Sequence, residues 1–125
     1  MGLGGAISSG FRNYVNFTGR APLSEYWFWE LFYTIVVVVA VSIDGALFPS
    51  WEEVSPVVTL VVLALFLPTL AISIRRLHDI DRSGAWILIG VIPLLGFVLL
   101  IIWACKAGTK GTNRFGPDPF GNPEN

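Results

Sequence analysis

Apolar residues occupy three long runs along the chain. The runs are residues 26–43, 54–74 and 85–105, and Glu30 is the only Asp, Glu, Lys or Arg residue within them. At 1.5 Å per residue, helices of this length measure about 27 to 32 Å, close to the roughly 30 Å hydrocarbon core of a bilayer. Strands would leave backbone groups unsatisfied in lipid, and uncharged runs of this length fit the alternative, a soluble helical bundle, poorly. The pattern predicts an all-α integral membrane protein with three transmembrane helices.

The third run contains a break that allows a second topology. Pro93 and Gly96 interrupt it at its middle. We expect the run to cross the membrane once as a straight helix. The alternative is a re-entrant helical hairpin that turns at this break, which requires its irregular backbone to be buried in protein. The choice decides on which side the polar tail, residues 106–125, lies.

Composition supports a single membrane domain that covers residues 1–125. Hydrophobic residues make up 54% and charged residues 14% of the chain, and the mean hydropathy is +0.66. A net charge of −1 lacks the basic footprint of a nucleic-acid-binding protein. One cysteine and one histidine cannot form an internal disulfide or a zinc site of those residue types. We therefore predict no cofactor, no metal and no nucleic-acid partner.

The positions of Lys and Arg predict the orientation. The loop of residues 44–53 carries three acids and no base, so the positive-inside rule places it outside the cell. The N-terminus and residues 75–84 then face the cytoplasm. A straight third run would put the basic tail outside, against the rule, whereas the hairpin would return it to the cytoplasm. The bases that flank the runs are Arg12, Arg20, Arg75, Arg76, Arg82, Lys106, Lys110 and Arg114.

A short interfacial segment is expected before the first run, at residues 10–20. Phe11, Tyr14 and Val15 have the i, i+3, i+4 spacing of an amphipathic helix lying on the membrane surface. Ser24 is a candidate N-cap for the helix that follows, and Trp27 and Trp29 are typical of an aromatic belt.

Glu30 stands about one turn inside the first run. An acid at this depth costs on the order of 1 to 3 kcal/mol unless it is paired. A short loop favours antiparallel packing of the first two runs, which returns Arg75 and Arg76 to the same membrane face. We therefore predict a structural ion pair between Glu30 and one of these arginines. An ion or proton relay through Glu30 is the alternative.

The segment RRLHDIDRSG, residues 75–84, gathers both signs of charge and the only histidine. We predict a tight structural corner in which Asp79 meets Arg75 or Arg76 along the helix and Asp81 or Ser83 caps the next helix. Binding of anionic lipid headgroups is a side role that adjacent arginines allow. No nucleophile accompanies His78, so we predict no catalytic residue. The candidate residues are Arg20, Glu30, Arg75, Arg76, His78, Asp79, Arg82 and Ser83.

Three sequence blocks carry a family resemblance. They are NFTGRAPLSEYWFW, RRLHDIDRSGAW, and IPLLGF followed by GTKGTNRFGPDP. Together they resemble the signature of a bacterial inner-membrane family, catalogued as domain of unknown function number 805 and also called YhaH-like. The resemblance implies a multi-pass helical protein of the bacterial inner membrane, and it brings no catalytic residue. The motif residues here are Gly19, Arg20, Glu25, Tyr26, Trp27, Arg75, Arg76, Leu77, His78, Asp79, Ser83, Gly84, Gly108, Asn113, Gly116 and Pro119.

Two classes of function fit the sequence. The first is a non-enzymatic accessory or structural subunit of a larger membrane assembly, because short spans bury little surface against each other and no chemistry is evident. The second is a homo-oligomeric channel or transporter-like protein in which Glu30 and the Arg75/Arg76 corner line a path. A membrane sensor or effector that signals through the tail is a further alternative.

Overall fold

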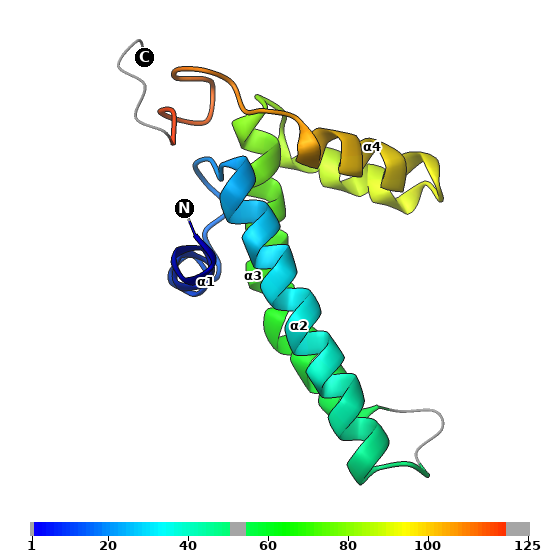
Figure 1. The fold of residues 1–125 in the computed structure, drawn as a ribbon. Helices are drawn as coiled ribbons and strands as arrows, with labels where there is room; N and C mark the ends of the chain where they lie inside the picture. Colours follow the sequence, from blue (N-terminus) through cyan, green and yellow to red (C-terminus); the bar gives the residue numbers. More distant parts are fainter. Residues whose placement is uncertain (1, 51–54, 120–125) are drawn as a thin grey trace.

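The computed structural model describes residues 2–50 and 55–119, and its elements are helical (Figure 1). Among the described residues the only β-structure is an isolated bridge between Asn113 and Gly116. The predicted all-α class is therefore confirmed. The elements are α1 (Leu3–Arg12), α2 (Leu23–Leu47), α3 (Pro56–Asp79), the 3₁₀ helix η1 (Gly84–Val91) and α4 (Leu95–Cys105).

Helices α2 and α3 are long and apolar enough to cross a membrane. They lie side by side (Figure 1) and enclose a thin core in which Trp29 and Ile72 are fully buried. Most of their apolar side chains point outward instead; Val38, Leu60 and Leu63 are each more than half exposed. An apolar surface of this kind is suited to contact with lipid or with a neighbouring membrane helix. The predicted third span has no counterpart of spanning length among the described residues.

The third apolar run folds into a hairpin, so the prediction of a straight crossing is wrong. Helix η1 ends at Val91 and α4 begins at Leu95. Leu94 adopts a left-handed φ of +65° at the turn, which follows Pro93. A Cβ on Gly96 would lie 1.8 Å from the carbonyl oxygen of Ile89, so glycine lets the two arms approach. The hairpin and α1 both lie at the end of the helix pair where α2 begins and α3 ends (Figure 1). We call this the charged end.

Helix α1 begins upstream of the predicted interfacial segment. It spans Leu3–Arg12 and packs across α2, with the ring of Phe11 5.5 Å from that of Trp29. A Cβ on Gly10 would lie 2.2 Å from the Trp29 ring, which explains a glycine at this contact. Trp29 is therefore a core residue and not part of an aromatic belt. The cap prediction for Ser24 is also wrong, because the N-cap of α2 is Pro22.

A proline inside α3 explains the position of Tyr14. Pro68 has no backbone N–H, so the carbonyl of Ala64, four residues earlier, loses its helical partner. The Tyr14 hydroxyl donates a hydrogen bond to that carbonyl. An unpaired carbonyl is costly in lipid, so this contact ties the segment after α1 to α3.

At the opposite end of the pair, Asp44 joins α2 to the start of α3. Its two carboxylate oxygens accept from the amides of Val57 and Val58, each at 2.9 Å. These are among the amides that a helix N-terminus leaves unpaired, and a negative charge there is favoured by the helix dipole. The contact fixes α2 and α3 as antiparallel neighbours.

The hairpin brings the described part of the tail, residues 106–119, back to the charged end. We therefore predict that cysteines introduced as Ser83→Cys and Thr112→Cys, in a Cys105→Ser background, are protected from an impermeant thiol reagent in intact cells. Ser50→Cys, beside the loop without bases, should react. Labelling of Thr112→Cys but not Ser83→Cys would place the tail on the outside and contradict the topology.

Candidate functional site

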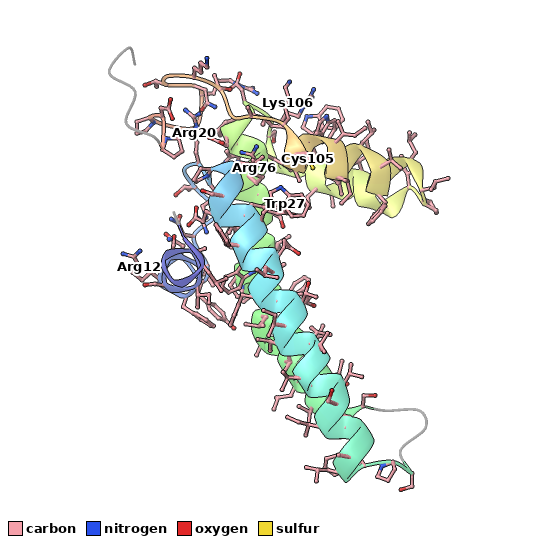
Figure 2. All side chains as sticks on the ribbon, viewed as in Figure 1. Arg12, Arg20, Trp27, Arg76, Cys105 and Lys106 are labelled. Carbon is pink, nitrogen blue, oxygen red and sulfur yellow. The ribbon has the colours of Figure 1, made fainter. Side chains whose placement is uncertain are left out.

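The charged end is a buried cluster. Residues 75–80, RRLHDI, are all buried, and the exposed fractions of Arg75, Arg76 and Asp79 are 4%, 2% and 1%. The sequence allows the adjacent Arg75 and Arg76 a side role in binding lipid headgroups, but in the structure both are buried against protein. Figure 2 shows Arg20, Trp27 and Arg76 gathered here, while Arg12 extends outward from α1. Buried charges require partners, and the partners define the site.

Asp79 is the centre of the cluster. Its Oδ1 accepts from Arg20 Nε at 2.9 Å and its Oδ2 accepts from Arg76 Nη1 at 2.5 Å. Its backbone carbonyl accepts from the Thr109 amide at 2.7 Å. A Cβ on Gly108 would lie 2.1 Å from Asp79 Oδ2, so a larger residue would push the tail away from the carboxylate. The predicted pairing of Asp79 with Arg76 is confirmed.

Arg20 and Arg76 connect this centre to backbone carbonyls. Arg20 Nη1 donates to Gly111 at 2.6 Å and to Gly116 at 3.3 Å, and its Nη2 donates to Thr109. Each of these acceptors belongs to the tail. A guanidinium that binds carbonyls from a separate segment acts as a multidentate clasp.

Arg76 joins the start of α2 to the end of α4. Its Nη1 donates to Ala21 at 3.2 Å, its Nε to Ala104 at 3.4 Å and its Nη2 to Lys106. All of its nitrogens therefore have acceptors.

Arg75 points to another partner than the sequence predicts. Its Nη1 lies 3.6 Å from Glu25 Oε2, and Glu25 also accepts from the Ser9 hydroxyl of α1. The prediction that Arg75 or Arg76 pairs with Glu30 is therefore wrong. Arg75 Nε and Nη2 are buried and have no hydrogen-bond partner within the described structure. The pair thus joins α2 to α3, and the Ser9 hydroxyl adds α1 to it, while part of the guanidinium remains unsatisfied.

His78 has a structural environment. Its Nδ1 lies 2.8 Å from the carbonyl oxygen of Gly19, which can only accept, so Nδ1 carries the proton. Its ring stacks on Phe115 with a centroid distance of 4.0 Å. Its backbone carbonyl accepts from Asn113 Nδ2 at 2.8 Å. The contacts with Phe115 and Asn113 show that His78 holds the tail in place.

Arg82 and Ser83 lie at the base of the hairpin. The Arg82 guanidinium lies over the Trp103 ring at 4.4 Å, and Trp103 in turn packs edge-on against Trp86. The Ser83 side chain accepts from the Ala85 amide, which confirms the predicted cap.

An exposed ion pair closes the outer side of the site. Arg114 Nε lies 3.2 Å from Asp81 Oδ1. Desolvation raises the pKa of Asp81, but the side-chain and backbone hydrogen bonds from Arg114, together with the charges of Arg114 and Arg20, outweigh it and lower the pKa overall. A lowered carboxyl pKa means that this contact is present at neutral pH and is lost as the pH falls through that pKa.

Glu30 lies apart from the cluster and lines a cavity. Among the described residues its carboxylate makes no ion pair, although Arg76 lines the same cavity. The structure therefore separates the predicted site residues into a bonded cluster, a hairpin base and a lone acid. The described residues include no group of three or more potential His, Cys, Asp or Glu metal ligands.

Sequence reasoning missed Glu25 and the tail as partners. Glu25 is 3% exposed and balances Arg75, and Asp118, 8% exposed, accepts from the Gly111 amide. Glu25 follows Arg20 by five residues in the same sequence block, which was the available signal. The tail reads as an extended, turn-rich segment, and its carbonyls carry no side-chain signature.

These features define a small helical membrane protein whose polar residues bind one another. The chain belongs to the DUF805 family, a protein family of unknown function, whose model matches residues 14–117. It is similar to inner membrane protein YhaI of Escherichia coli K12, with 46% identity over 89% of this chain and 92% of that protein. It is also similar to inner membrane protein YhaH of the same organism, with 42% identity over 86% and 90%. No solved structure matches the chain.

The comparisons agree with the family resemblance of the three sequence blocks. The protein is an inner membrane protein of an uncharacterised family. The matched range includes the buried arginines, Asp79, and the tail glycines that contact them.

Proposed function

We propose that this protein is a non-enzymatic accessory or structural subunit of a larger inner-membrane assembly. The observation that supports this most is the use of its charged residues. The Asp79 carboxylate binds both Arg20 and Arg76, and the two arginines also bind backbone carbonyls, so their hydrogen bonds hold the chain's own elements together. A charge cluster of this kind stabilises the arrangement of the chain's own elements.

The exposed apolar surface of α2, α3 and the hairpin favours a partner within the membrane. In the apolar stretches of α2 and α3, only 11% and 22% of the residues, respectively, are buried inside the chain. Helices associate in lipid through close packing of their surfaces. Because the interface between α2 and α3 is thin, most of the surface of both helices stays available for packing against other helices. The hairpin adds exposed apolar side chains such as Leu88, Val91 and Leu94. Another membrane protein is the partner that we propose for these surfaces.

Anionic lipid headgroups are a second partner that the exposed bases favour. Arg12, Lys106 and Lys110 are exposed at the charged end. Bases near a membrane surface contribute about 1 kcal/mol each to attraction by anionic lipid. The buried arginines are enclosed by protein and do not belong to this group.

A homo-oligomeric channel or transporter-like protein is the second candidate function. The lone Glu30 carboxylate favours it, because an acid inside a span usually has a functional partner. Arg75 and Arg76 are buried against protein in one copy, so several copies would have to supply the rest of the path.

Extraction of the full-length protein from its own membranes in mild detergent, followed by native mass spectrometry, tests the proposal. We expect a membrane protein other than this chain in constant stoichiometry. Leu94→Ser and Leu63→Ser, at positions 77% and 68% exposed, compare hairpin and span contacts without disturbing the core. A single self-assembled mass with no other subunit would favour the homo-oligomer instead.

A further inference from the structure

Three elements of the described structure line a cavity beside the helix pair. Helices α2 and α3 and the hairpin line an open cavity of about 300 Å³. This lies at the small end of the roughly 300–1,000 Å³ typical of ligand pockets. The hairpin supplies an apolar wall that includes Ile87, Phe97 and Ile101. A ligand here would lie beside the helix pair, next to the bilayer.

The opposite wall is polar and carries one free charge. Glu30, Thr69 and Ser73 line it, and Glu30 makes no ion pair with any described residue. Arg76 also borders the cavity, but each of its nitrogens already donates to Asp79 or to a backbone carbonyl. The cavity therefore has an uncompensated carboxylate and no base available to meet it.

The hydroxyl groups of this wall already bond to other described groups, so they do not compete for the Glu30 carboxylate. The Ser73 hydroxyl donates to the Thr69 carbonyl at 2.8 Å and is also hydrogen-bonded to the Tyr26 side chain, and the Thr69 hydroxyl accepts from Trp29 Nε1 at 3.0 Å. Aromatic rings of Tyr26 and Phe97 also border the cavity. Ring faces attract cations, most strongly where water is excluded. The carboxylate and the aromatic rings both suit a cationic group.

We propose that this cavity binds an ammonium-bearing amphiphile. Its positive head group lies against Glu30, and its apolar chain lies along the hairpin wall and continues into the bilayer. Both a soluble alkylammonium compound and an amine-bearing phospholipid have this chemistry. The inference does not depend on whether the protein is an accessory subunit.

The test uses the full-length protein in a nonionic detergent. Decyltrimethylammonium, below its micelle concentration, is titrated by calorimetry and compared with decanol, which has the same chain without charge. We expect the cation to bind and Glu30→Gln to weaken its affinity at least tenfold. Asp81→Asn, which removes an acid that does not line the cavity, should leave the affinity unchanged. Equal affinity for decanol, or an unchanged affinity in Glu30→Gln, would show that the cavity holds apolar chains only and would overturn the proposal.

A second variant protects the test if Glu30→Gln fails to fold. Ile101→Trp keeps the carboxylate and fills the cavity, so it should abolish cation binding; retained binding would place the ligand elsewhere and overturn the assignment. Native mass spectrometry from nanodiscs then separates the two ligand sources. Phosphatidylethanolamine that stays bound to the wild type but not to Glu30→Gln identifies lipid as the occupant. Alkylammonium binding without retained phosphatidylethanolamine identifies a soluble amphiphile.

Discussion

Asp79→Asn is expected to cause the largest loss of stability of any single substitution in the charged end. The carboxylate contacts both Arg20 and Arg76, and the side chains of all three residues are at most 2% exposed. Asparagine is nearly isosteric, so the change removes charge without leaving a cavity. Two buried guanidinium groups would then lose their counter-ion, and breaking one such pair costs about 3 to 5 kcal/mol.

The loss should be visible as a fall in the thermal unfolding midpoint in detergent and as lower yield of monodisperse protein. Asp81→Asn is the matched control, because Asp81 also pairs with an arginine but on the surface, where the two side chains are 42% and 64% exposed. Exposed pairs contribute little, so its midpoint should stay close to that of the wild type. Equal shifts for the two variants would contradict the central role of Asp79.

Protease protection should show where the Asp79→Asn structure opens. The tail reaches Asp79 through Thr109 and Gly108 and is clasped by Arg20, so it should detach first. The α2–α3 pair is joined at its other end by Asp44 and should persist. Cleavage confined to the tail at low protease would agree with this order.

The membrane class was predictable because its signal is local. Long uncharged apolar runs identify lipid-facing helices residue by residue, and α2 and α3 match the first two runs closely. The hairpin was also readable as an alternative from Pro93 and Gly96. What decided between the two topologies is tertiary: η1 and α4 pack on each other, and Arg82 holds their base through Trp103.

The ion-pair partners were not predictable because they depend on helix rotation. Glu25 and Glu30 are five residues apart, which places them about 140° apart around α2. The face of Glu25 meets Arg75 and α1, whereas the face of Glu30 meets the cavity. Arg75 and Arg76 are likewise about 100° apart around α3 and point to different neighbours. The depth of Glu30 in the first run suggested it as the partner of these arginines, but depth does not specify which face of α2 a residue occupies.

The bounds of α1 were missed because its sequence has weak helix propensity. The stretch LGGAISSGFR contains three glycines and two serines. Glycine is a poor helix former in isolation, yet Gly10 permits the close contact with Trp29 that holds α1 in place. Tertiary packing therefore outweighs local preference here.

Glu25→Gln is expected to produce the second largest loss, because it leaves the buried Arg75 without a counter-ion. The two side chains are 4% and 5% exposed, and removing one partner of a buried pair costs about 3 kcal/mol or more. Arg75→Gln should cost a similar amount, since Glu25 then keeps only the Ser9 hydroxyl as a partner. The double variant Glu25→Gln/Arg75→Gln should lose less than the two single losses summed, with a coupling of about 0.5 to 3 kcal/mol.

The same cycle with Glu30 in place of Glu25 distinguishes the structure from the sequence-based pairing. Glu30→Gln and Arg75→Gln should be additive, because the two residues belong to different faces and share no contact among the described residues. Midpoints from thermal or denaturant unfolding in one detergent supply both cycles. Arg75 also has two nitrogens without partners, so replacing both Glu25 and Arg75 by methionine should be close to neutral or stabilising. If the Glu25 and Arg75 losses were additive and the Glu30 and Arg75 losses were coupled, the assignment would be reversed. Arg75 would then pair with Glu30, as the sequence predicts.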